Sequence, residues 1–224
     1  MLIEELFPKD MQIASLPFAV RFFCCFTFLA NGSYQKCIAN NIYAPLSQSS
    51  ASRAIKYICN LIVKHKSSEV TFPITNEEQL AIKATFYTKF GLKGGVGAID
   101  CTHVALICPP KNDTTKPCSL YMNRKGYYSV NVEAVCDDKL RFLAINANFP
   151  GSCHDSGLWT TSKVRSFMST QRGSLLLGDQ GYPLQPWLIT PLAEPASLQE
   201  PRGCDYNSKH LLYFTQYDGE IVAK

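Results

Sequence analysis

The chain has 224 residues, with 22 basic and 18 acidic side chains and a formal net charge of +4. Hydrophobic residues make up 46% and charged residues 18%, where about 25% charged is usual, which excludes a disordered, collagen-like or coiled-coil chain. The length fits one domain, or a small domain joined to a larger one. The ten cysteines are scattered without a Cys-x-x-Cys pair, so we expect free thiols in a reducing compartment.

The apolar run from Ile13 to Ala30 is the first candidate element. It is barely long enough to cross about 30 Å of hydrocarbon, and Pro17 and Arg21 interrupt it. Glu4 stands where a signal peptide would carry basic residues. We therefore expect a buried helix here, with neither a membrane span nor secretion.

Two further helices are predicted before residue 91. One begins after Ser47, where apolar side chains recur on one face at spacings of four, three and four residues: Ala51, Ile55, Ile58 and Ile62. The other begins with a capping-box pattern of Thr75 and Glu78, whose side chains can bond each other's free backbone amides, and runs to about Phe90.

After Gly91 the pattern changes to strands separated by turn residues. The expected strands cover residues 96–108, 128–134, 140–149 and 174–177, and one helix over 155–168 stands before the last of them. Three strands in a meander, a helical crossover and a fourth strand predict an α/β fold with a mixed sheet.

Two aspartates occupy strand positions at which a charge is costly. Asp100 lies within the first expected strand, and Asp179 ends the last one. If these strands are neighbours, the two side chains can bind a hard divalent cation, which activates water for phosphodiester hydrolysis. The spacing is equally compatible with two turn or helix caps. Asp155 is a third acidic candidate, and its place just before a helix favours an N-cap.

Other catalytic chemistries have less support. Ser152, His154 and Asp155 stand together, but the nucleophile-elbow spacing of a hydrolase triad is absent. Cysteine and histidine are close at three places, namely Cys101 with His103, Cys153 with His154, and Cys204 with His210. Without a Cys-x-x-Cys pair, these places give a structural zinc site little support.

Two segments carry features of nucleic-acid binding. Residues 121–128 mix aromatic side chains with Arg124 and Lys125, which favours a loop that holds phosphate, although a solvated turn with core tyrosines explains it nearly as well. Residues 47–55, which include Arg53, begin with small polar side chains, as the DNA-recognition helix of a helix-turn-helix does.

Taken in order, four motifs resemble the Harbinger transposase family and its domesticated relatives, the Harbinger transposase-derived nucleases. The motifs are GAIDCTHV at 97–104, NRKG at 123–126, PGSCHDS at 150–156 and GDQGYPL at 178–184. Residues 21–34 and 47–54 are similar to the helix-turn-helix region of that family. The likeness covers roughly residues 5–210.

The resemblance implies a helical region with a helix-turn-helix over residues 1–92 and a DDE endonuclease domain of RNase H-like fold over 93–224. It also implies that Asp100 and Asp179 are the first two acids of the catalytic set and hold Mg²⁺ or Mn²⁺. The helix that carries the third acid in the family is not continued over residues 211–224, so we expect a domain that is incomplete at its C-terminus. Glu220 is not assigned to that role.

Two functions follow from this resemblance. The first is a metal-dependent DNA nuclease of transposase descent, in which Arg124, Lys125 and Arg53 bind DNA. The second is a catalytically inactive module that recruits DNA or a protein. The family implies a Myb-like DNA-binding partner, and DNA binding suggests the nucleus, with the cytoplasm left open; no membrane role is expected. A metabolic hydrolase that uses Ser152 or Cys153 is a remote third reading.

Overall fold

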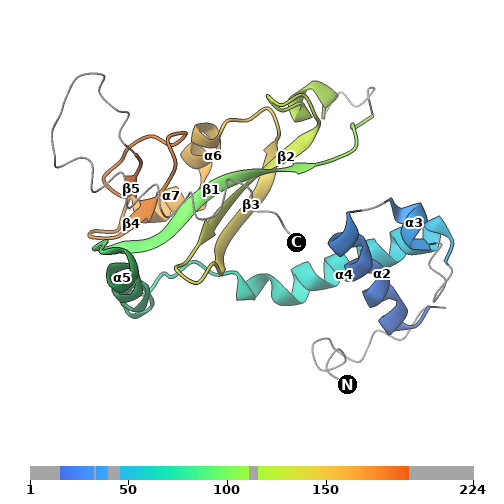
Figure 1. Cartoon of the computed structure of the whole chain (residues 1–224), viewed down its shortest axis with the longest axis horizontal. Helices are drawn as coiled ribbons and strands as arrows, with labels where there is room; N and C mark the ends of the chain where they lie inside the picture. The colour runs from blue at the N-terminus through green and yellow to red at the C-terminus, as the bar shows by residue number, and fades with distance from the viewer. Residues whose placement is uncertain (1–15, 33, 40–45, 111–115, 192–224) are drawn as a thin grey trace. The chain divides into compact units, whose positions relative to one another are not determined.

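The computed structural model describes residues 16–32, 34–39, 46–110 and 116–191. They form two compact units, which divide between Glu69 and Val70 (Figure 1). We treat each unit by itself.

The first unit consists of helices. They are α2 (Phe18–Asn31), α3 (Gln35–Ala39), α4 (Gln48–Lys66) and the short 3-10 helix η2 (Ser67–Glu69). Ser47 caps α4 as predicted, because its hydroxyl accepts a hydrogen bond from the backbone N of Ser50 at 3.1 Å. The predicted apolar stripe of α4 packs against α2 and α3 in a small core: Cys24, Cys25, Ile38, Ala51, Ala54, Ile55, Ile58 and Leu61.

Helix α2 buries one face only. Arg21 lies on that face and is 7% exposed, since its guanidinium donates to the backbone O of Leu16 at 2.7 Å and sits 4.9 Å from the ring centre of Tyr57. Phe23 and Leu29 are exposed on the other side, so the expected burial of this helix holds for one face. None of the helices in the described ranges is long and apolar enough to cross a membrane. The helix-turn-helix stays a prediction.

The second unit is a mixed α/β fold, as expected. Its elements are α5 (Asn76–Phe90), β1 (Gly95–Ala105), the 3-10 helix η3 (Cys118–Tyr121), β2 (Ser129–Cys136), β3 (Phe142–Pro150), α6 (Asp155–Thr161), α7 (Lys163–Met168), β4 (Leu175–Leu177) and β5 (Leu188–Ile189). The sheet has the order β3-β2-β1-β4-β5. The first three strands are antiparallel, whereas β4 is parallel to β1 and β5 is parallel to β4.

Helix α5 packs against β1 of the sheet. The capping box of Thr75 and Glu78 is present as predicted. Helix α5 lies against β1, where a Cβ on Gly95 would be 2.9 Å from the Phe86 ring. This close approach places the helix in the unit that begins at Val70. The domain division at residue 92 that the resemblance implies stays a prediction.

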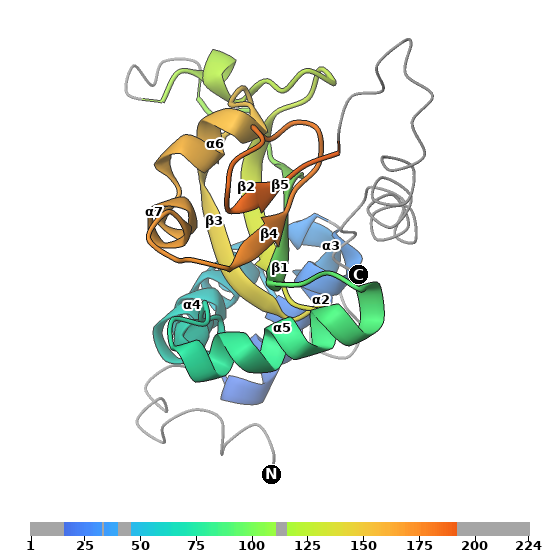
Figure 2. The same cartoon turned by 90° about the vertical axis from the view of Figure 1, so that its left-hand side faces the viewer.

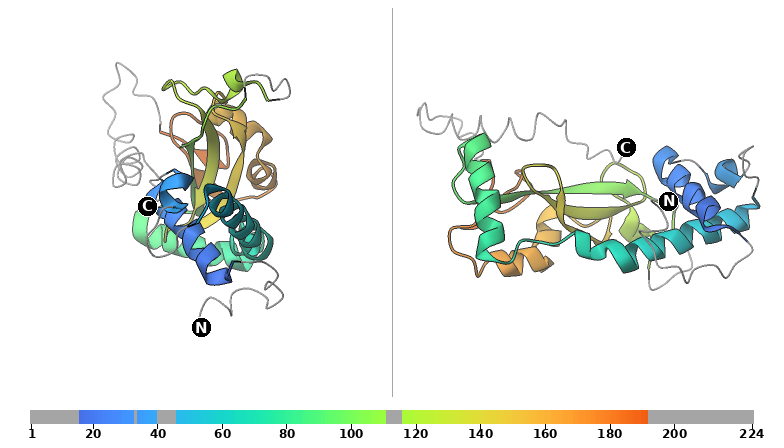
Figure 3. Two further views of the ribbon diagram at one scale, coloured as in Figure 1. Left: turned by 90° about the vertical axis from the view of Figure 1, so that its right-hand side faces the viewer. Right: turned by 90° about the horizontal axis from the view of Figure 1, so that it is seen from below.

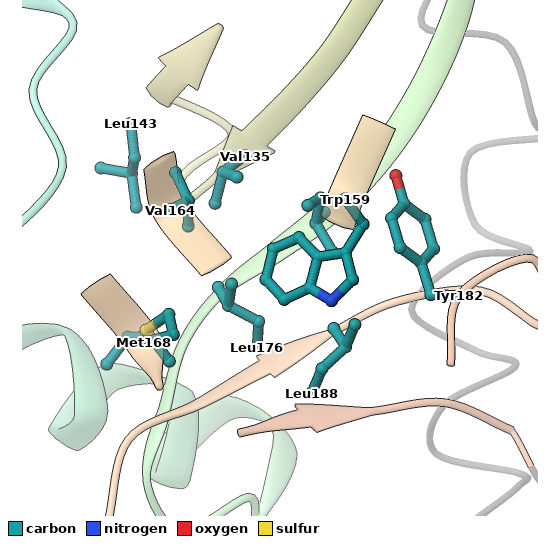
Figure 4. Packing of buried hydrophobic residues seen from close by; sticks show 10 residues of the cluster. Val135, Leu143, Trp159, Val164, Met168, Leu176, Tyr182 and Leu188 are labelled. Atoms are coloured by element: carbon teal, nitrogen blue, oxygen red, sulfur yellow. The ribbon is translucent and has the colours of Figure 1, made fainter. Parts of the chain in front are cut away.

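Helices α6 and α7 cover one face of the sheet, as Figure 2 and the right-hand view of Figure 3 show. The core of the unit lies between these helices and the sheet (Figure 4). It comprises Val96, Ile99, Val135, Leu143, Trp159, Val164, Met168, Leu176, Tyr182 and Leu188. Trp159 is fully buried, and its Nε1 donates to Gln185 Oε1 at 2.9 Å.

The single helix expected over 155–168 is two helices. The chain is extended at Ser162, which separates α6 from α7. The Ser162 hydroxyl donates to Glu133 Oε1 on β2 at 2.7 Å, so a buried long-range hydrogen bond accompanies the break. The two-residue strand β5 was not predicted.

Candidate active site

The neighbouring strands β1 and β4 bring Asp100 and Asp179 together. Ala98 pairs with Leu177 in the parallel register, and each aspartate follows two residues later. Asp100 lies within β1 and Asp179 just past the end of β4, and the two carboxylates are near enough for the charge of Asp179 to raise the pKa of Asp100. The structure thus brings together the two aspartates that we singled out from the sequence.

Asp100 sits in a site that disfavours its charge. Burial, together with the negative charges of Asp179 and Asp155, raises the pKa of its carboxyl to about 6 from the usual 3.8. The hydrogen bond from the backbone N of Cys101, at 2.7 Å, opposes this shift. Asp100 is therefore a carboxylate that a nearby cation would stabilise.

Asp155, at the start of α6, joins this pair. Its Oδ1 accepts a hydrogen bond from Asn131 Nδ2 on β2 at 3.0 Å, and the same amide donates to the backbone O of Cys153 at 3.0 Å. The residue in the N-cap position is His154, so the N-cap interpretation of Asp155 is wrong. Asp155 is held toward the carboxylates by a side chain 24 residues earlier in the chain.

The backbone at Gly181 lies between two of the carboxylates. A Cβ there would be 3.0 Å from Asp179 Oδ1 and 3.4 Å from Asp155 Oδ2. The backbone N of Gly181 also donates to Asp179 Oδ1 at 2.9 Å. Burial raises the pKa of Asp179, Asp155 raises it further, and the charge of Arg124 opposes the shift. The GDQG segment thus turns back beside both acids, and a side chain at position 181 would press on their carboxylates.

The donor set fits a hard divalent cation. Asp100, Asp155 and Asp179 come from three different elements, and in the described part of the chain no basic side chain forms an ion pair with any of them. Carboxylate oxygens are the ligands that Mg²⁺ and Mn²⁺ prefer. The side chains are not drawn into a closed ligand shell, since no cluster of three or more His, Cys, Asp or Glu residues within the described ranges is placed to coordinate an ion. Glu220 lies outside the described residues.

A turn with two basic side chains lies within electrostatic reach of the acids. We call Asn123–Tyr127 the basic turn. Arg124 and Lys125 are exposed on it, and Arg124 is the charge that opposes the raised pKa of Asp179. Arg53 belongs to the other unit, where it is exposed on α4 and donates to Ser50 Oγ at 3.3 Å.

The described residues do not assemble the other candidate sites. Cys101 and His103 have different partners: Cys101 Sγ lies 3.0 Å from Tyr182 Oη, and His103 Nδ1 lies 3.1 Å from Ser129 Oγ. Burial raises the pKa of the Cys101 thiol, which disfavours a thiolate ligand. Cys204 and His210 lie outside the described residues. The nine cysteines inside them are all free thiols.

Comparisons with known proteins connect this site to a family. Residues 99–213 match the profile of a family described as "DDE superfamily endonuclease". The chain is 33% identical over 185 residues to "Putative nuclease HARBI1" of Mus musculus and 34% identical over 185 residues to that of Homo sapiens. Each match covers 82% of this chain and 50% of the relative. It is 30% identical over 145 residues to "Protein ALP1-like" of Arabidopsis thaliana, covering 58% of this chain and 34% of the relative.

The chain spans about half the length of the HARBI1 relatives it matches. No solved structure matches it. The family profile begins within β1 and extends past β5, so the matched residues include all three aspartates. On these grounds the chain belongs to the Harbinger transposase-derived family of DDE superfamily endonucleases.

Proposed function

We propose that this protein is a divalent-metal-dependent DNA nuclease. The observation that carries the proposal is the meeting of Asp100, Asp155 and Asp179 without a basic partner among the described side chains. Like charges at a partly buried site repel one another, and binding of a cation would relieve that repulsion. Membership of an endonuclease family points to a phosphodiester as the bond that is hydrolysed.

Asp100 and Asp179 would hold the ion, with Asp155 as the third carboxylate. Mg²⁺ or Mn²⁺ bound there would activate water and stabilise the leaving oxygen of the phosphodiester. The chain itself positions the acids. Asn131 orients Asp155, and the backbone N atoms of Cys101 and Gly181 each fix one oxygen of Asp100 and Asp179.

DNA is the proposed nucleic acid, with Arg124, Lys125 and Arg53 as phosphate contacts. The first two stand on the basic turn near the acids, where a strand about to be cut must pass. Arg53 belongs to a helix without a single acidic residue, which also exposes Lys56 and Lys64. A nuclear location and a Myb-like partner protein remain predictions from the family resemblance.

A second candidate function is an inactive DNA- or protein-binding module. It is favoured by one observation: the carboxylates in the described ranges are not arranged as a closed metal-binding cluster. The two functions differ in whether a divalent ion binds at Asp100 and Asp179, and this can be measured directly.

The deciding experiment is a plasmid-nicking assay with Mn²⁺ on the whole chain. We expect the wild type to nick supercoiled DNA, and we expect both Asp100→Asn and an EDTA control to be inactive. Absence of nicking by a well-folded wild type would favour the binding module. Equal nicking by Asp100→Asn would point to a contaminating nuclease and reject the assigned site.

Calorimetric titration with Mn²⁺ separates metal binding from activity. We expect Asp100→Asn and Asp179→Asn each to weaken Mn²⁺ binding by at least about tenfold, because each removes one charged ligand. Glu77→Gln is the matched control, since Glu77 is an exposed carboxylate at the start of α5. Unchanged affinity in both aspartate variants would reject the metal site.

A further inference from the structure

Beside the candidate site lies a hydrogen-bonded chain of three side chains. Asn123 Nδ2 donates to Ser129 Oγ at 2.9 Å, and Ser129 Oγ lies 3.1 Å from His103 Nδ1. Asn123 is 4% exposed and Ser129 is fully buried, whereas His103 is half-buried. This series of hydrogen bonds joins the basic turn to β2 and then to β1, the strand that carries Asp100.

The hydrogens available on Asn123 and Ser129 determine which atom donates and which accepts in each of the two hydrogen bonds. Ser129 has one hydroxyl hydrogen, and its oxygen already accepts from Asn123. A buried hydroxyl is expected to donate as well, and His103 Nδ1 is the acceptor within reach. Nδ1 is then unprotonated, and a neutral imidazole carries its hydrogen on Nε2.

Burial and two basic side chains favour the neutral form of the His103 ring. Burial lowers the pKa of His103, and Lys125 and Arg124 lower it further, while Asp155 opposes them. The ring lies edge-on to Tyr127 with 6.5 Å between the ring centres. In the described part of the chain no hydrogen bond is made to Nε2. The Nε2–H group is therefore a free donor on a ring whose other edge is fixed.

Asn123 also determines the shape of the basic turn. Its Oδ1 accepts from the backbone N atoms of Lys125 at 2.9 Å and Tyr127 at 3.3 Å, and its own backbone N donates to the Tyr127 carbonyl at 3.0 Å. Gly126 takes the left-handed conformation, with φ of 83°, that closes such a turn. One buried amide therefore orients both Arg124 and Lys125 and, through Ser129, His103.

We propose that His103 is a further DNA-contacting residue, which donates from Nε2 to a backbone phosphate beside the carboxylates. Asn123 and Ser129 are the positioning residues that fix this imidazole and the basic turn as one phosphate-binding subsite. The proposal deepens the proposed function and rests on it, since the ligand is the DNA backbone of the same site. A neutral donor contributes a hydrogen bond and releases no counterion, unlike Arg124 or Lys125.

The test measures affinity for a fluorescein-labelled DNA duplex at several salt concentrations, in EDTA and slightly alkaline buffer. We expect His103→Ala to weaken binding by about tenfold, with an unchanged slope of affinity against salt. His103→Gln, which keeps an N–H donor near Nε2, is expected to restore most of the affinity. Arg124→Ala should lower the slope by about one unit, because a charged phosphate contact is lost.

Two further variants complete the design. Asn123→Ala should lower both affinity and slope, since it releases the turn that presents Arg124 and Lys125. Lys139→Ala is the control for surface charge, because Lys139 is exposed just beyond the C-terminal end of β2, whereas Ser129 begins that strand. We expect it to bind as the wild type does.

The outcomes separate this inference from the proposed function. If His103→Ala binds DNA as tightly as the wild type, the inference is overturned. It is also overturned if His103→Ala lowers both the affinity and its salt slope and His103→Gln restores neither, because the imidazole would then only support the turn. A wild type that does not bind the duplex overturns both proposals. A wild type that binds but does not nick with Mn²⁺ overturns the nuclease alone.

Discussion

Glu133 is a buried carboxylate in the middle of β2. It is 2% exposed, its Oε1 accepts from Ser162, and its Oε2 has no hydrogen-bond partner in the described part of the chain. Burial raises the pKa of Glu133 above its usual 4.5, the charge of Asp155 raises it further, and the Ser162 hydrogen bond opposes the shift. The folded state thus favours the protonated form, so the stability that Glu133 contributes is complete below about pH 4.5 and is lost as the pH rises through the folded-state pKa.

Glu133→Gln should therefore stabilise the protein at neutral pH. The amide keeps an acceptor for Ser162 and cannot ionise, so we expect an increase in the free energy of unfolding on the order of 1 kcal/mol at pH 7 and almost none near pH 4. Urea unfolding at the two pH values measures the difference. Glu77→Gln, at an exposed position, should show no such pH dependence. An effect of equal size at both pH values would contradict the assignment of a raised pKa.

The loop before α6 shows how an element is positioned by backbone contact. Gly151 N donates to the Ser129 carbonyl at 2.8 Å, and a Cβ on Gly151 would be 2.7 Å from the carbonyl oxygens of both Ser129 and Tyr121. Only glycine allows this approach. The loop leads directly into Asp155, so its path decides where that carboxylate lies.

Gly151→Ala should displace the loop and lower the free energy of unfolding by roughly 2 kcal/mol, because two of the three obstructing atoms are backbone oxygens and the third is the hydroxyl of the buried Ser129. Gly157→Ala is the matched control within α6, where a Cβ would meet open space. That variant should be neutral or more stable by up to about 1 kcal/mol, as alanine favours a helix. Urea unfolding followed by tryptophan fluorescence measures both. Equal effects of the two substitutions would refute the role of the close contact.

At the scale of the whole molecule, two separate cores have formed. One is built from α2, α3 and α4, and the other lies between the sheet and helices α6 and α7. Both tryptophans of the chain, Trp159 and Trp187, belong to the second unit. Tryptophan fluorescence thus reports on the second unit, while helical circular dichroism includes the first.

Substitutions in the two cores should therefore affect different signals. We expect Leu176→Ala to lower the stability seen by fluorescence by about 2 to 5 kcal/mol, since it leaves a cavity at a fully buried position. Ile58→Ala should leave that transition unchanged and destabilise part of the helical signal instead. Coincident shifts of both signals in either variant would mean that the two units unfold as one.

Local features were predictable because the residues that determine them are close in sequence. The capping box joins Thr75 to Glu78, Ser47 caps its own helix, and alternation along β2 marks its buried side. The order of the elements predicted a mixed sheet but left open whether β1 and β4 are neighbours, which the sheet order shows them to be. The resemblance to the Harbinger family is what paired Asp100 with Asp179 from the sequence.

The sequence by itself determined the types of most elements and the mixed sheet, and it singled out Asp100 and Asp179 as the aspartates proposed to hold the ion. Only the tertiary structure decided the rest: the place of α5 against β1, the break at Ser162, the convergence of Asp155 on the other acids, and the link from Asn123 through Ser129 to His103. The physical reason is the range of the interactions. Caps and periodicity act within a few residues, whereas these contacts join side chains that become neighbours only once the strands have paired in register.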